Sequence, residues 1–414
     1  MLNDYKKMVL KLLLGISLLG LAACEKINTA LDTPDITYMN VNIEAIPALP
    51  EIESTAGLKV VLQNYTEQYI IERTLSAGKT PIDSIIPGVY SILISGELKS
   101  GEDRYFLSGS RTNYMVVPGN ENIEIRVDGA TVGPLAFSEI YYAGSGPFYF
   151  RDQFYEITNN SDEVVYVDGL YFANLHPTIA TTDLPTWPAE DNNAYVYAQR
   201  VWRIPGNGND YPLRPGESFT IAQFAANHKL SQYNPNSPID ASRSEFEFNM
   251  DNPNFPDQPA IDMQHIFYDG RAAKGSVPQY LTSVFGGAYV IFRLAEGEQY
   301  DPVGDINLQT RDLGTTAPTL YAKIPIRYVV DAVEAGHNES MVTAKRVSSI
   351  LDAGMTWVGA TYNAQGVRRK RSGTRENGSP ILLDTNNSTE DFERQVIPQF
   401  RYYEQRIPAW SRTN

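Results

Sequence analysis

Short runs in which apolar and polar residues alternate, broken by Gly, Pro, Asn or Asp, recur along most of this chain of 414 residues. An alternation of period two places successive side chains on opposite faces of a β-strand, and the interrupting residues favour turns. The clearest early runs are residues 58–63, 69–75, 90–94, 114–117 and 123–127. We therefore predict a mainly β protein that contains a small β-sandwich over residues 54–129.

The first residues of the chain have the pattern of an export signal. Lys6, Lys7 and Lys11 precede the apolar run 12–21, which is shorter than the about 20 residues that span a bilayer. Leu21-Ala22-Ala23-Cys24 follows, and Cys24 is the only cysteine. This segment resembles the lipobox of bacterial lipoproteins, which implies a signal peptide over residues 1–23 and lipid attachment at Cys24. The alternative is a buried free thiol.

The residues after Cys24 are expected to form a tether. Residues 24–53 lack a sustained period and contain Pro34, Pro47 and Pro50, which suits an extended, lipid-anchored spacer. Glu25 stands where some inner-membrane lipoproteins carry Asp. We therefore expect an outer-membrane protein that is exposed at the cell surface. A location on the periplasmic face of that membrane remains the alternative.

Two further resemblances concern the domains. Pro87-Gly88-Val89-Tyr90 is similar to the strand entry of transthyretin-like domains. Three later segments, 134–142, 152–161 and 165–170, together with the closing run 384–392, resemble the lamin-tail-like domain. The second resemblance implies an immunoglobulin-like β-sandwich over residues 130–414, interrupted by long insertions near 174–198 and 227–285.

Taken together, these segments resemble a family of Bacteroidetes surface lipoproteins known as a domain of unknown function. The resemblance implies a non-enzymatic accessory binding or scaffold component of a nutrient-uptake assembly, with a TonB-dependent outer-membrane transporter or other surface lipoproteins as partners. It supplies no catalytic residue. A surface glycan-binding protein and a hydrolase without a recognisable motif remain alternatives.

Charge and spacing argue against several other functions. The net charge of −15 disfavours nucleic-acid binding, because a polyanion would be repelled. The four histidines, at positions 176, 228, 265 and 337, lie too far apart for a zinc motif, and we expect no metal and no cofactor. Two acidic runs could instead hold calcium, but turn residues are the preferred interpretation; they comprise Asp251, Asn252, Asn254 and Asp257, and Asp384, Asn386, Ser388 and Glu390.

Aromatic residues in and beside the first insertion are the candidates for ligand binding. Trp187, Tyr195, Tyr197 and Trp202 could stack on sugar rings, or they could fill half-buried strands. A basic run, 368–371, stands out from the acidic background. We interpret it either as a solvated hairpin tip or as a contact for a negatively charged partner.

Overall fold

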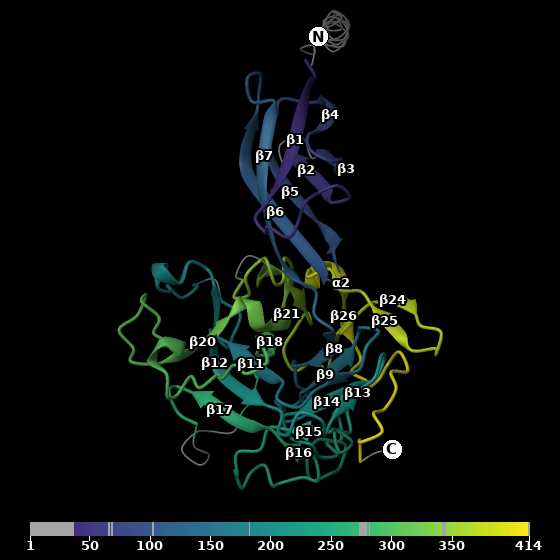
Figure 1. Ribbon diagram of the computed structural model, residues 1–414. Coiled ribbons are helices and arrows are strands. Elements are labelled where there is room, and N and C mark those ends of the chain that lie inside the picture. The colour runs from purple at the N-terminus through teal and green to yellow at the C-terminus, as the bar shows by residue number, and fades with distance from the viewer. Residues whose placement is uncertain are drawn as a thin grey trace, which may run out of the picture.

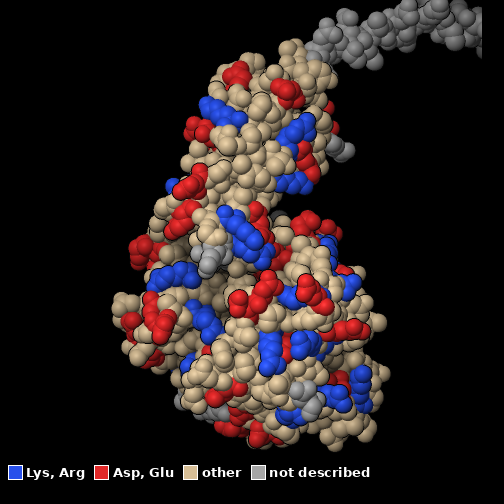
Figure 2. Space-filling view, turned by 45° about the vertical axis from the view of Figure 1, so that its right-hand side comes forward, with Lys and Arg blue, Asp and Glu red and all other residues tan. Residues whose placement is uncertain are grey.

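The computed structural model describes residues 37–64, 67, 69–101, 103–181, 183–272, 280, 282–341 and 345–412. Cys24, the signal segment 1–23 and the tether up to residue 36 lie outside these residues. A narrow N-terminal sandwich stands on a broader second sandwich (Figure 1). In the described residues, no helix has the length and apolar character needed to cross a membrane. Acidic and basic side chains are interspersed over the face drawn in Figure 2.

The N-terminal sandwich contains seven strands in the order β3-β2-β5-β6-β7-β1-β4. Their alternating side chains enclose one apolar core that includes Val60, Tyr90 and Ile125, and the five early runs predicted as strands are confirmed. The strands are β1 (Met39–Pro47), β2 (Lys59–Asn64), β3 (Tyr69–Thr74), β4 (Thr80–Ile85), β5 (Gly88–Ser100), β6 (Asp103–Val116) and β7 (Asn122–Thr131).

Strand β1 corrects the predicted tether. Residues 42–47 pair in parallel with residues 122–127 of β7, and Val41, Ile43 and Ala45 are buried in the core. These three residues are themselves an alternating run, so burial of their side chains favours a strand over a free spacer. The prediction of a spacer up to residue 53 is therefore wrong from residue 39 onward, and the first sandwich begins earlier than residue 54.

The two sandwiches are joined by a very short connection. Strand β7 ends at Thr131 and β8 begins at Leu135. The Val132 N–H donates to the Arg104 carbonyl at 2.9 Å. A Cβ atom placed on Gly133 would lie 2.2 Å from the Val330 carbonyl oxygen, so the backbone of the connection lies directly against the second sandwich. Because β1 runs parallel to β7, β1 begins at the end of the first sandwich away from the second.

Two sheets form the second sandwich, and the prediction of a mainly β, sandwich-type fold is confirmed. The first sheet has the order β16 (Ile261–Asp262), β15 (Phe246–Glu247), β14 (Ser218–Ala222), β9 (Phe154–Asn159), β8 (Leu135–Tyr141), β23 (Gly366–Arg369) and β26 (Phe392–Val396). The second has the order β19 (Gln309–Thr310), β20 (Tyr321–Pro325), β12 (Tyr195–Arg203), β11 (Tyr171–Leu175), β18 (Ala288–Phe292), β21 (Val329–Gly336) and β22 (Thr356–Trp357), with β17 (Gln264–Tyr268) also paired to β12.

Smaller elements complete the second sandwich. Two two-stranded sheets are β10 (Val165–Tyr166) with β13 (Pro212–Leu213), and the hairpin β24 (Arg371–Thr374) with β25 (Pro380–Leu382). One turn of α-helix, α2 (Ser388–Asp391), precedes β26. The 3-10 turns are η1 (Ala189–Asp191), η2 (Ile306–Leu308), η3 (Ile326–Tyr328) and η4 (Glu339–Met341).

The sheet containing β11 and β18 is covered on both faces. Its inner face supplies Phe172, Trp202 and Tyr289 to the main core between the sheets. Its outer face supplies Ala173 and Val290 to a second core. Loop residues close that second core, among them Leu294, Tyr300, Leu308, Val347 and Leu351. Every residue of β11 and β18 is consequently buried.

The two predicted insertions contain more regular structure than expected. The first one overlaps the end of β11 and the start of β12, which leaves 176–194 as the connecting loop. The second one contains β15, β16 and β17. Strands of two to five residues are too short to show a clear alternation, so the sequence did not reveal them.

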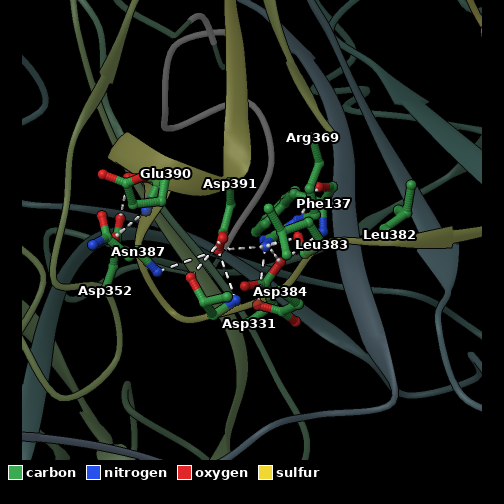
Figure 3. Close-up of polar contacts among 12 residues, drawn as sticks. Phe137, Asp331, Asp352, Arg369, Leu382, Leu383, Asp384, Asn387, Glu390 and Asp391 are labelled. Carbon is green, nitrogen blue, oxygen red and sulfur yellow. Dashed lines mark hydrogen bonds and ion pairs between the residues drawn. The ribbon is translucent and has the colours of Figure 1, made fainter. Parts of the chain in front are cut away.

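A buried arginine connects four parts of the second sandwich (Figure 3). Arg369 of β23 donates from Nε to the Phe137 carbonyl at 2.9 Å and from Nη2 to Asp331 at 2.7 Å. Its Nη1 donates to Asp384 at 2.9 Å and to Asp391 at 3.3 Å. Burial raises the pKa of Asp331 to about 7 and that of Asp391 to about 6, which opposes the ionisation that the guanidinium favours.

This network corrects the interpretation of the basic run 368–371. Arg369 is only 1% exposed, and Arg368 is buried as well, where its Nε donates to Glu139 at 2.7 Å. Both side chains belong to β23, in the interior of a sheet. The run is therefore neither a hairpin tip nor a surface for an acidic partner, although Arg371 at its end is exposed.

We expect the unfolding free energy of the protein to depend on pH because His228 is buried. Its Nε2 lies 2.9 Å from the Phe224 carbonyl and its Nδ1 lies 2.7 Å from the Tyr149 hydroxyl, and burial lowers the pKa of the imidazole to about 4. The folded state therefore prefers neutral His228, and its stabilising contribution, present above about pH 6.5, is lost as the pH falls toward 4. We expect urea unfolding to show this loss, and the loss to be smaller in a His228→Gln variant. An equal pH dependence in both proteins would contradict the assignment.

Candidate functional site

A cleft of about 550 Å³ opens at one end of β11 and β12. One wall is the loop 176–194 that joins these two strands, and the other is the segment 345–348. The described residues that line it are His176, Leu184, Pro185, Trp187, Pro188, Ala189, Asn192, Asn193, Tyr195, Val196, Tyr197, Lys345, Arg346, Val347 and Ser348. The cleft is thus built by two segments that are far apart in the sequence.

Stacked rings form the apolar part of the cleft, which we call the aromatic cleft. The Trp187 indole lies on the Tyr197 ring with 4.0 Å between centroids and 12° between planes. The His176 ring lies on Tyr321 at 4.0 Å and 30°, and Tyr321 meets Trp187 edge-on at 5.5 Å. These contacts restrict the rotation of Trp187, so its ring is held in place before any ligand arrives.

A buried ion pair between Asp191 and Lys323 contacts two tyrosines of the cleft, Tyr195 and Tyr197. The Tyr197 hydroxyl donates to Asp191 Oδ2 at 2.8 Å, and Lys323 forms an ion pair with the same carboxylate. Lys323 lies opposite Tyr197 in the β12–β20 register, and its Nζ is 4.3 Å from the centre of the Tyr195 ring. Burial and the adjacent carboxylate raise the pKa of the Tyr197 hydroxyl far above its usual range, so the hydroxyl stays a hydrogen-bond donor.

His176 supplies a neutral polar atom at the cleft. Burial lowers the pKa of its imidazole to about 4, so the ring carries no charge near neutral pH. Among the described residues its buried Nδ1 has no hydrogen-bond partner. A neutral imidazole can donate or accept a hydrogen bond, depending on its tautomer, but the enclosed Nδ1 is not open to a ligand, and only the part of the ring that lines the cleft can contact one.

The cationic residues of the cleft are already engaged. The Arg346 guanidinium pairs with Glu334 at 2.6 Å, and both side chains are fully buried. Lys345 donates to the carbonyl oxygens of Asp352 and Gly354. The described lining residues include no carboxylate. The aromatic cleft therefore combines rings with neutral polar groups, which suits an uncharged ligand rich in hydroxyls.

The structure brings together three of the four predicted aromatic residues. Trp187, Tyr195 and Tyr197 all line the aromatic cleft. Trp202 is different, because its side chain is fully buried in the main core, where the rings of Phe248 and His265 lie 4.9 and 4.8 Å away. Its prediction as a ligand-binding residue is therefore wrong. Cys24 lies outside the described residues.

Sequence reasoning missed several residues of this site. Tyr321 and Lys323 belong to β20, more than a hundred positions after Trp187, and no local pattern connects them. His176 was considered only as a zinc ligand, and its spacing from the other histidines argued against that role. The only available signal was its place in the same insertion as Trp187, and that signal does not reveal the stacking on Tyr321.

The two acidic runs have different surroundings. In the second run Asp384 binds Arg369 and Ser388 donates to Asp352 at 2.6 Å, so these residues serve the fold. Among the described residues of the first run, only Asp257 joins a carboxylate cluster, in which one oxygen each of Asp257, Glu247 and Asp262 lie within 4.8 Å of one another. Asn249 donates to Asp257 at 3.1 Å and to Asp262 at 3.3 Å, and two backbone N–H groups donate to Glu247 at 2.9 Å.

The fold and the cleft define an all-β protein of two sandwiches with a preformed aromatic cleft. Comparison with known proteins places it further: the chain belongs to the DUF4876 family, whose model is described as a protein of unknown function and matches residues 214–399. A crystal structure of a DUF4876 family protein from Bacteroides thetaiotaomicron VPI-5482 is 51% identical, covers 91% of this chain and 100% of that chain, and superposes with a TM-score of 0.67. No curated protein matches the sequence.

Proposed function

We propose that this protein is a non-enzymatic, lipid-anchored surface protein that captures a saccharide in the aromatic cleft for an outer-membrane nutrient-uptake assembly. The observation that carries the proposal is the cleft itself, in which Trp187 is fixed against Tyr197 beside the neutral ring of His176. The apolar faces of sugar rings pack on aromatic rings, and their hydroxyls need neutral donors and acceptors.

The charges of the cleft support binding over hydrolysis. Most glycoside hydrolases use two carboxyl groups on either side of the scissile bond, whereas the described residues lining the cleft include none. The described carboxyl groups with raised pKa values lie outside the cleft lining; among them, Glu139 and Glu156 are buried inside a sheet, and Asp331 binds Arg369. Their burial accounts for these shifts without a catalytic role.

The position of the chain's start supports an anchor at Cys24. Strand β1 begins at the end of the first sandwich that faces away from the second (Figure 1), and an anchor at Cys24 would therefore attach to that end. The first sandwich then acts as a spacer between the membrane and the second sandwich, which carries the aromatic cleft. This arrangement leaves the cleft open to ligands outside the cell.

A Trp187→Ala variant tests the saccharide part of the proposal. We expect binding to a neutral oligosaccharide, chosen from a panel of glucan, xylan and mannan fragments by calorimetry on the wild type, to weaken about tenfold or more, because the main stacking surface is lost. Tyr38→Ala is the matched control, since Tyr38 is an exposed aromatic residue of the first sandwich. Equal affinities for the two variants would overturn the assignment of the cleft, as would a panel that the wild type does not bind.

Affinity purification from the native membrane tests the assembly part. A tagged wild-type protein, extracted in mild detergent, is expected to bring down a TonB-dependent transporter in stoichiometric amount by mass spectrometry. A Cys24→Ala variant should leave the membrane fraction and lose the lipid label. Recovery of the lipidated protein alone would refute a stable assembly, and a membrane-bound, lipid-labelled Cys24→Ala variant would refute the anchor.

A further inference from the structure

A second cleft, of about 400 Å³, lies at the opposite end of β11 and β12 from the aromatic cleft. Tyr171, the first residue of β11, pairs with Arg203, the last residue of β12, and with Phe292 of β18 on its other side. Arg203, Tyr171 and the next residue after Phe292, Arg293, all line this cleft. We call it the arginine cleft.

Arg293 is a half-buried cation that donates to neutral partners. Its Nη1 donates to the Asp168 carbonyl at 3.4 Å, and its Nη2 donates to the Tyr166 carbonyl. Burial lowers the pKa of the guanidinium below its usual value. Partial removal of a charge from water is costly, and an anion bound beside the guanidinium would offset that cost.

Arg203 provides a second guanidinium in the same cleft. Its Nη1 donates to Gln264 Oε1 at 3.1 Å, and its guanidinium carbon lies 5.9 Å from the centre of the Tyr171 ring. Within the described part of the chain, neither Arg203 nor Arg293 forms an ion pair with a carboxylate. In a protein with a net charge of −15, two arginines that share a cleft and have only neutral partners are unusual.

The carboxylates that line the arginine cleft are occupied by other groups. Asp168 accepts hydrogen bonds from the backbone N–H groups of residues 208, 210 and 211, at 2.9 to 3.1 Å. Asp301 accepts from the N–H groups of residues 303 and 304. Glu298 lies 3.9 Å from Arg327. Within the described residues, none of these carboxylates forms an ion pair with Arg203 or Arg293, although the charge of Asp168 opposes the effect of burial on the pKa of Arg293.

We propose that the arginine cleft binds the carboxylate of an acidic saccharide, with Arg203 and Arg293 as its cationic ligands. A guanidinium presents two parallel N–H groups that match the two oxygens of a carboxylate, and the cleft volume is in the range of small-ligand sites. The neighbouring Tyr171 and Tyr300 supply apolar contacts for a sugar ring. This site is separate from the aromatic cleft, so it is tested independently of the proposed function.

The test compares a uronic acid with its neutral counterpart. Binding of D-galacturonate, D-galactose and inorganic sulfate to the full chain is measured by calorimetry or by ligand-observed NMR, at low and high salt. We expect galacturonate to bind at least tenfold more tightly than galactose, and its binding to weaken at high salt, because the interaction is ionic. Galacturonate binding no tighter than that of galactose would overturn the proposal, as would sulfate binding as tightly as galacturonate.

Two variants of Arg203 assign the binding to this cleft. Arg203→Gln is expected to weaken galacturonate binding at least tenfold, and Arg203→Lys should recover only part of that loss, since an ammonium lacks the paired N–H groups. Arg214→Gln, at an arginine outside the cleft whose side chain is 59% exposed, should bind as the wild type does. Unchanged binding in a folded Arg203→Gln variant would overturn the proposal, and a thermal melt establishes that the variant is folded.

Discussion

An Arg369→Ala variant is expected to lose about 3–5 kcal/mol of unfolding free energy, because removal of one partner from a buried ion network leaves the others uncompensated. The guanidinium contacts Asp331, Asp384 and Asp391 at once. Without it, three neighbouring carboxyl groups would share a buried space with no cation and would have to take up protons. Urea denaturation followed by circular dichroism at neutral pH measures the loss.

Arg371→Ala is the control for this variant, because Arg371 is two positions further along the same basic run but is exposed. Its unfolding midpoint should stay within the error of the wild type. The Arg369→Ala variant should also regain stability toward acid pH, since protonation neutralises the stranded aspartates. Equal midpoints for the two alanine variants would show that the buried network is not what holds β23 to the closing segment.

Replacement of Trp202 by alanine is expected to cost about 3–5 kcal/mol of unfolding free energy, the range for removal of a fully buried large ring. Trp202 packs in the main core against Phe248 and Tyr280, with centroids 4.9 and 6.0 Å away. The indole vacates a volume that close-packed neighbours cannot fill by small shifts. Thermal or urea unfolding measures the change.

Trp187→Ala is the natural comparison for Trp202→Ala, since the two tryptophans lie in or beside the same insertion but in different surroundings. Trp187 is half-buried at a cleft. The Trp187→Ala variant should therefore lose less unfolding free energy than Trp202→Ala, and it should lose more affinity for the saccharide. Trp202→Ala, measured below its lowered melting temperature, should keep that affinity. The reverse pattern, with stability lost at Trp187 and affinity lost at Trp202, would contradict the separation of core from site.

The elements that the sequence predicted well are those whose side chains alternate over several residues. Strands such as β2 and β7 bury every second residue in one core. The alternation in the sequence therefore corresponds directly to the alternation of buried and exposed side chains. β11 and β18 were harder to recognise as parts of a doubly covered sheet, because a strand buried on both faces shows no alternation. Their outer cover comes from loops that carry isolated apolar residues such as Leu308 and Val347.

The candidate site was only partly predictable, because composition identifies residue types but does not show which residues contact one another in the fold. Aromatic density selected both Trp187, which lines the aromatic cleft, and Trp202, which is buried in the core, since the two look alike until the register of β12 is known. The basic run was misread for the same reason: the three aspartates that neutralise Arg369 lie 15 to 38 positions away in the chain. Long-range pairing of this kind depends on the sheet order.

The doubly covered sheet of the second sandwich has a consequence for its slowest motions. Because β11 and β18 lie between two apolar cores and hydrogen bond to strands on both sides, their amide protons can reach solvent only when the cores open together. Hydrogen exchange in these ten backbone positions should therefore follow global unfolding, whereas the loop 176–194 should exchange by local opening. The chain thus carries its two clefts at the ends of its most slowly exchanging segment.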